Sequence, residues 1–166
     1  MWCSTRWGRS ACAVLAALLG ACAGPDTRPD VDRMALTDTL TALIESAYDF
    51  ETPGTLERMN ALYASSEGVV SASGGRITVS ADSVRQGVAR FWESAGQNMR
   101  NARWVWGQVY VEPLGSEGGV LTSTWSIPHI APDGQPHVIE GAWPAVFQRL
   151  DGDWKIVHEH LSVPGG

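Results

Sequence analysis

The hydrophobic pattern changes its period near the middle of this chain. In the first half, apolar residues recur every three or four positions, as they do along one face of a helix. The second half holds alternating stretches rich in Val, Ile, Thr and Trp, which Gly, Pro and Asp turns separate. Helices followed by consecutive strands are typical of α+β domains, in which helices pack on one face of a largely antiparallel sheet. The sequence therefore predicts an α+β fold.

The first half is expected to form three helices and a short hairpin. Helices are predicted over residues 31–50 and 55–63, the first capped by Asp30 or Asp32, and a third begins after Ser80 or Asp82. The hairpin, residues 68–73 and 76–79, lies between the second and third helices. Four long strands are predicted over residues 102–112, 118–127, 137–150 and 153–163.

The first 21 residues have the pattern of a signal peptide. Arg6 and Arg9 precede an apolar run, residues 11–21, that is too short for a permanent membrane-spanning helix. The run leads into Leu19-Gly20-Ala21-Cys22, which resembles the lipobox of bacterial lipoproteins. That resemblance implies cleavage before Cys22 and acylation of its thiol. The alternative is an ordinary secretory signal followed by an incidental cysteine.

This pattern divides the chain into a lipoprotein signal peptide (residues 1–21), a tether (22–30) and one domain (31–166). All three cysteines, Cys3, Cys12 and Cys22, precede the domain, so no disulfide is expected within it. If the lipoprotein resemblance holds, Ala23 implies anchoring at the periplasmic side of the outer membrane in a diderm host.

The charge of the chain argues against two classes of partner. It holds 12 basic and 18 acidic residues, and the basic ones form no cluster. Nucleic-acid binding is therefore not expected, and neither is electrostatic attraction to anionic lipid. Contact with a membrane is expected through the lipid anchor alone.

The C-terminal stretch DGDWKIVHEHLSVP, residues 151–164, contains two histidines around a glutamate. In a regular strand, one face would carry Trp154, Ile156, His158 and His160, and the other Lys155, Val157, Glu159 and Leu161. This separation excludes the zinc motif of helical metalloproteases, which needs histidines one helical turn apart. His129 and His137 could add metal ligands, but their spacing does not require it. We expect no metal and no cofactor.

Residues 149–164, RLDGDWKIVHEHLSVP, resemble the last hairpin of SnoaL-like domains in the nuclear transport factor 2 superfamily. They are also similar to the association domain of calcium/calmodulin-dependent protein kinase II. The positions that carry this likeness are Trp154, Val157, His158, His160 and Ser162. The predicted order of helices and strands over residues 31–164 also agrees with that of SnoaL-like domains.

The resemblance implies a cone, in which a strongly curved sheet wraps around the first helix and leaves an internal pocket. It also implies a homodimer formed through the outer face of the sheet. Such domains include ketosteroid isomerase, scytalone dehydratase and polyketide cyclases, and others only bind or assemble. The fold therefore leaves the choice between enzyme and binding module open.

Strand alternation also predicts which residues line the pocket, provided that no bulge at Pro144 exchanges the inward-facing and outward-facing positions. The expected ligand-binding residues are Trp125, Trp143, Ala145, Phe147, Val157 and Leu161. In the kinase association domain, pocket arginines occupy the positions of Trp125, Ala145 and Leu161, and this chain has no arginine there. The prediction is a largely apolar, aromatic pocket with one glutamate, Glu159.

Glu159 and Tyr48 are the candidate catalytic residues. Desolvation in an apolar pocket favours the neutral form of a carboxyl group, which is how proteins make a general acid or base. Alternatively, Glu159 is solvated at the pocket mouth or pairs with Arg149. Asp49 and Tyr63 also resemble polar pocket residues of related enzymes, and Tyr48 could serve packing alone.

Three functions remain open at this point. The first is binding of a small, largely apolar molecule without chemistry. The second is a cofactor-independent isomerase, dehydratase or cyclase that uses Glu159. The third is a structural or partner-binding envelope lipoprotein.

Overall fold

The computed structural model describes residues 32–65 and 68–164. The predicted signal peptide, Cys22 and the tether lie outside these residues. The helices are α1 (Arg33–Ala47), α2 (Thr55–Ala61), α3 (Ala81–Ser94) and the short 3-10 helix η1 (Gly96–Asn98). The strands are β1 (Val70–Ser73), β2 (Arg76–Val79), β3 (Val105–Pro113), β4 (Gly118–Ile130), β5 (Pro136–Leu150) and β6 (Asp153–Leu161).

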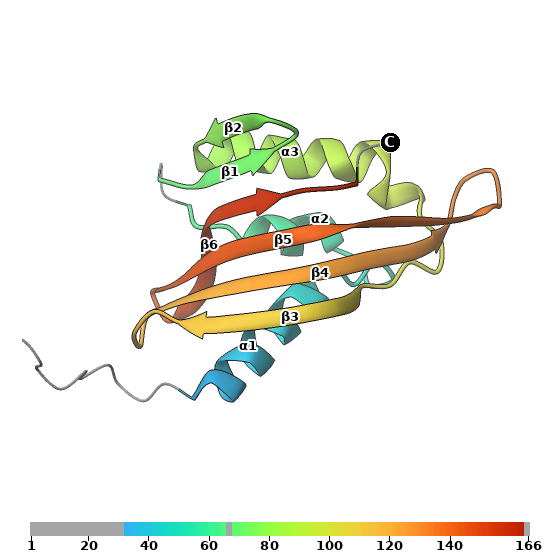
Figure 1. Ribbon diagram of the computed structural model, residues 1–166. Coiled ribbons are helices and arrows are strands. Elements are labelled where there is room, and N and C mark those ends of the chain that lie inside the picture. Colours follow the sequence, from blue (N-terminus) through green and yellow to red (C-terminus); the bar gives the residue numbers. More distant parts are fainter. Residues whose placement is uncertain (1–31, 66–67, 165–166) are drawn as a thin grey trace, which may run out of the picture.

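The strands form one sheet in the order β2-β1-β6-β5-β4-β3, in which β1 and β6 pair in parallel and every other pair is antiparallel. The sheet is curved, and the helices cover one of its faces (Figure 1). Helix α1 packs against strands β3 and β4, and helix α3 packs against strands β1 and β2. The predicted α+β cone is confirmed.

Helix α1 begins and ends at residues with clear capping roles. The Asp32 carboxylate accepts hydrogen bonds from the backbone N–H groups of Met34 and Ala35, at 2.9 and 3.2 Å. The helix ends at Ala47, three residues before the predicted end, because the chain turns there. The Arg58 guanidinium holds this turn by donating to the carbonyl oxygens of Ser46 and Asp49. Such fixed ends set where Tyr48 lies relative to the sheet.

A β-bulge changes the alternation of side chains in β6. Val146 pairs with His158, but the next β5 residue, Phe147, pairs with Ile156, so Val157 is an extra residue. Ile156 is consequently buried with Phe147, while His158 is exposed. The prediction that Ile156 shares a face with the histidines was wrong, because it assumed a regular strand. No bulge occurs at Pro144 in the β4–β5 pairing, where the register is unbroken.

The hydrophobic core draws on helices α1 and α3, on the segment that follows α2 and on strands β3 to β6, from Leu36 near the start of α1 to Ile156 in β6. Because this core lies wholly within the described residues, we expect the chain from residue 30 onward to fold by itself. In the part of the chain that the structure describes, no helix has the length and apolar character needed to cross a membrane.

Candidate functional site

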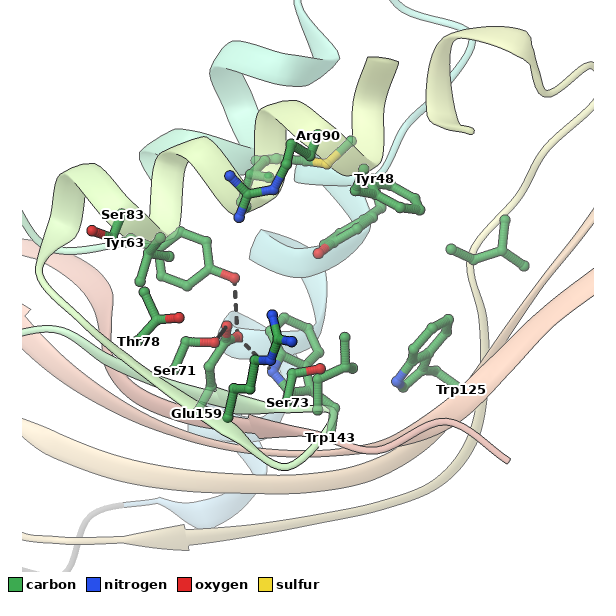
Figure 2. Close-up of a pocket in the computed structure, with 18 of the residues that line it drawn as sticks. Tyr48, Tyr63, Ser71, Ser73, Thr78, Ser83, Arg90, Trp125, Trp143 and Glu159 are labelled. Carbon is green, nitrogen blue, oxygen red and sulfur yellow. Dashed lines mark hydrogen bonds between the residues drawn. The ribbon is translucent and has the colours of Figure 1, made fainter. Parts of the chain in front are cut away.

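A cavity of about 360 Å³ lies between the inner face of the sheet and helices α2 and α3. Aromatic side chains dominate its wall, and hydroxyl groups from β1, β2 and α3 add polar points (Figure 2). The aromatic residues that line it are Tyr48, Tyr63, Phe91, Trp104, Trp125 and Trp143.

Glu159 lies in the wall of this cavity and is only 6% exposed. Its Oε2 atom accepts hydrogen bonds from the Tyr63 hydroxyl at 3.0 Å and from Trp143 Nε1 at 2.8 Å. Its Oε1 atom accepts one from the Ser71 hydroxyl at 2.7 Å. Three neutral donors therefore hold this carboxylate, as the dashed lines in Figure 2 indicate in part.

The strand register brings these groups together. The parallel pairing of β1 and β6 places Ser71 opposite Glu159, and the antiparallel pairing of β5 and β6 places Ala145 opposite it. Trp143 is two residues before Ala145 and therefore faces the same side of the sheet. Tyr63 follows α2 and is bridged to Ile156 of β6.

Glu159 has no ion-pair partner within the described residues. The pairing with Arg149 that the sequence left open does not occur, because Arg149 donates to the carbonyl of Gly152 instead. A solvated position is also excluded by the low exposure of Glu159. A buried carboxylate without an ion-pair partner is unusual in a purely structural role, since its desolvation is costly.

Tyr48 and Tyr63 both supply phenol groups to the cavity. Burial, and then the negative charge of Glu159, raise the pKa of each tyrosine above its usual value. Both therefore stay neutral at physiological pH and can donate hydrogen bonds. Tyr63 donates to Glu159, whereas the Tyr48 hydroxyl forms no hydrogen bond with the described residues. Figure 2 shows the Tyr48 hydroxyl directed into the cavity, where a ligand oxygen could accept from it.

These raised pKa values predict a loss of stability in alkali. Unfolded tyrosine ionises near pH 10, so above that pH the unfolded chain releases protons that the folded chain retains. Stability is therefore complete below about pH 10 and falls as pH rises further, by up to about 1.4 kcal/mol per pH unit for each tyrosine.

Absorbance at the phenolate band checks this prediction in Tyr110→Phe, which removes the exposed third tyrosine. Phenolate is expected to appear only together with the change in tryptophan fluorescence that marks unfolding. Phenolate in a chain that is still folded would contradict the prediction.

The tryptophans form a continuous aromatic surface beside Glu159. Trp104 and Trp125 are stacked, with ring centroids 4.9 Å apart and an interplanar angle of 15°. Tyr48 and Trp143 both contact Trp104, at centroid distances of 4.6 and 5.9 Å. The Nε1 atoms of Trp104 and Trp125 are buried and have no hydrogen-bond partner among the described residues. Buried donors of this kind are rare in folded proteins unless a ligand or water satisfies them.

Two arginines that the sequence reasoning missed also line the cavity, Arg76 from β2 and Arg90 from α3. Figure 2 shows the Arg90 guanidinium reaching into the cavity from α3. Helical spacing could have identified Arg90, because Ser83, Gly87 and Arg90 recur at the spacing of one helix face and all three line the cavity. Ser71 was also missed, since its role depends on a parallel pairing that the sequence does not show.

The predicted site residues fall into two groups. Tyr48, Trp125, Trp143, Glu159 and Leu161 line the cavity. The others do not: Ala145 and Phe147 are buried in the core, and Val157 is the half-buried bulge residue. Asp49 also lies outside the cavity wall, and its carboxylate accepts from the Thr52 hydroxyl and the Glu51 N–H.

The histidines do not gather into a metal centre in the structure. His158 and His160 are exposed on β6, while His129 and His137 face each other across β4 and β5 with ring centroids 5.2 Å apart. Across residues 32–65 and 68–164, no group of three or more His, Cys, Asp and Glu side chains is suitably placed for a metal ion.

A protein-family model matches most of this chain. The model described as "SnoaL-like domain" matches residues 40–165. The chain belongs to the SnoaL-like domain family. The likeness of its last hairpin to SnoaL-like domains is therefore confirmed. No curated protein matches this SnoaL-like chain at a significant level.

Solved structures share the fold of this SnoaL-like chain at low sequence identity. A candidate scytalone dehydratase from Novosphingobium aromaticivorans has 11% identity and a TM-score of 0.63, over 80% of this chain and 86% of its own. The association domain of calcium/calmodulin-dependent protein kinase II from Caenorhabditis elegans has 14% identity and a TM-score of 0.62, over 78% and 97%. A nuclear transport factor 2-like protein from Salmonella enterica has 14% identity and a TM-score of 0.61, over 81% and 95%. At these identities the likeness shows the fold alone.

Proposed function

We propose that this protein is an exported, lipid-anchored SnoaL-like domain that binds a small, largely apolar molecule in its cavity. One observation carries the proposal: a buried carboxylate without an ion-pair partner among the described residues lies in the wall of a cavity that the rings of Trp104, Trp125 and Trp143 also line. The volume of about 360 Å³ is within the range of small-molecule sites.

The chemistry of the wall defines the kind of molecule. A flat, unsaturated body would stack against Trp104 and Trp125, which present broad apolar faces. A hydroxyl or N–H group on that body could donate to Glu159, and a carbonyl could accept from Tyr48. A purely aliphatic molecule would leave the Tyr48 hydroxyl without an acceptor.

Gly87 provides a direct test because it lines the cavity in the middle of α3. A Cβ atom added there would meet only the Arg90 Nη2 atom, at 3.7 Å. Gly87→Ala should therefore be tolerated and should stabilise the helix by about 0.5–1 kcal/mol. Gly87→Leu should extend a side chain into the cavity and fill part of it.

The probe is the neutral fluorescent molecule N-phenylnaphthylamine, titrated into the chain from residue 30 onward. We expect binding by the wild type and Gly87→Ala, and at least tenfold weaker binding by Gly87→Leu. If all three bind equally, the probe occupies another surface and the proposed site fails. If none binds, binding of apolar aromatic molecules by the cavity is contradicted.

A second candidate function is proton transfer without a cofactor, which the position of Glu159 favours. The carboxylate faces the cavity without an ion-pair partner among the described residues, and the Tyr48 hydroxyl is available to polarise a ligand carbonyl. In an isomerisation, Glu159 would take a proton from the carbon beside the carbonyl. The double bond would shift, and the proton would return to the far carbon.

A β,γ-unsaturated ketosteroid tests this chemistry, because isomerisation creates a conjugated enone that absorbs in the ultraviolet. Glu159→Gln should lower the rate by at least about 100-fold. Its affinity for N-phenylnaphthylamine should stay within about twofold. Absence of turnover by the wild type, together with tight binding of the probe, would favour a binding protein.

Export, acylation and dimerisation belong to the same proposal. Acylation at Cys22 predicts that the protein partitions into membranes and that Cys22→Ala releases it.

The fold shared with an association domain supports a homodimer, which sedimentation of the chain from residue 30 would detect. A monomer that binds a specific envelope protein would instead favour the structural alternative.

A further inference from the structure

We propose that the cavity selects an amphipathic acid, with its anionic group held by Arg76 and Arg90 and its apolar body against the tryptophans. This inference rests on the proposed binding function and deepens it. It concerns arginines that lie on β2 and α3, away from Trp125, Ala145 and Leu161.

The two arginines approach the cavity from elements that contact each other. Helix α3 packs against β2, and both Arg76 and Arg90 line the space beside them. Arg76 directly follows the Gly74-Gly75 turn, where both residues have positive φ values of 56° and 73°. A tight turn of this type fixes the direction in which β2 leaves it. Arg90 lies one helical turn after Gly87, and Gly87 leaves its guanidinium uncovered.

Neither guanidinium has a carboxylate or carbonyl partner among the described residues. The described ion pairs involve Arg33, Arg85 and Lys155, and Arg58 and Arg149 donate to backbone carbonyls. Arg100 and Arg103 likewise have no such partner among the described residues, but they do not line this cavity, whereas Arg76 and Arg90 do. Guanidinium groups bind carboxylate, sulfonate and phosphate oxygens in paired hydrogen bonds.

The charges in the cavity also give the ligand an orientation. Glu159 repels an anion, and its oxygens are suited to a neutral donor on the ligand. Arg90 enters from α3, across the cavity from Glu159 (Figure 2). An acid would therefore place its anionic group toward Arg90, away from this carboxylate, and a hydroxyl or N–H group toward Glu159. The tryptophans would contact the apolar part of the ligand, between its anionic group and its hydroxyl or N–H group.

Two probes with the same aromatic body test the inference. Anilinonaphthalene sulfonate carries a permanent anion, and N-phenylnaphthylamine is its neutral counterpart. The quantity measured is the ratio of their Kd values on the chain from residue 30 onward, at low and high salt. The variants are Arg76→Gln, Arg90→Gln and the double variant, with Arg85→Gln as the matched control on α3 outside the cavity wall.

Each single variant should weaken binding of the sulfonate relative to the neutral probe by about threefold to tenfold. The double variant should weaken it by at least about tenfold. Added salt should produce the same shift in the wild type and little in the double variant. Arg85→Gln should leave the ratio within about twofold. Binding of the neutral probe with an unchanged ratio in the double variant would overturn the anion inference and leave the proposed function standing. Failure of both probes to bind would overturn both.

Discussion

Glu159→Leu is expected to lower the free energy of unfolding by about 3 kcal/mol, whereas Glu159→Gln should lower it by less than about 1 kcal/mol. Leucine leaves the Tyr63 hydroxyl, the Ser71 hydroxyl and Trp143 Nε1 without their acceptor. Each unpaired buried donor costs about 1–3 kcal/mol, and release of a desolvated charge offsets part of that sum. Glutamine keeps an oxygen for Tyr63 and Trp143, and its amide can donate to Ser71.

Urea denaturation of both variants measures this difference, with the slope m expected to stay unchanged. A Glu159→Leu variant as stable as the wild type would mean that the three hydrogen bonds contribute nothing net. A Glu159→Gln variant as unstable as the leucine variant would show that the negative charge, and not the hydrogen bonding, stabilises the wall. Either result would contradict the geometry described for this site.

Leu40→Ala is expected to lower the free energy of unfolding by about 3–4 kcal/mol, because it removes a side chain that is 0% exposed. Leu40 lies on the face of α1 that approaches β4. A Cβ atom added at Gly119 of β4 would lie 3.1 Å from Leu36 Cδ2 and 3.8 Å from Leu40 Cδ1. The helix is therefore too close to the sheet for the cavity left by alanine to close easily.

Met34→Ala is the matched control, since Met34 belongs to the same helix and is 74% exposed. We expect its effect to stay within about 0.5 kcal/mol. A Leu40→Ala variant that loses less than about 1 kcal/mol would indicate that α1 does not pack inside the curved sheet. Urea midpoints of the two variants, measured side by side, decide between these results.

The fold was accessible from the sequence because the apolar period reports which face of each element is buried. The change of period predicted helices before strands, and the third helix begins directly after Ser80, one of its two predicted caps. Element ends were less accurate. The second long strand extends to Ile130, beyond the predicted residue 127, because β4 and β5 stay paired up to Ile130 and Pro136. Such long-range pairing leaves no local signal.

The site was only partly predictable for a related reason. Strand alternation leads to Glu159, Trp143 and Trp125 without knowledge of the pairing. It fails at Val157, because a bulge depends on the register with β5 and not on β6 alone. Ser71 and Arg76 come from a short hairpin whose parallel partner is the last long strand, far away in the chain. The contact between Ser71 and Glu159 is therefore a tertiary result.

Native mass spectrometry of the purified chain from residue 30 tests the central claim most directly. The claim is that the cavity beneath α3 holds a small molecule. The account predicts extra mass of one small molecule per chain on the wild type and on Gly87→Ala, and none on Gly87→Leu. Bare protein mass in all three chains, or the same extra mass in all three, would contradict it.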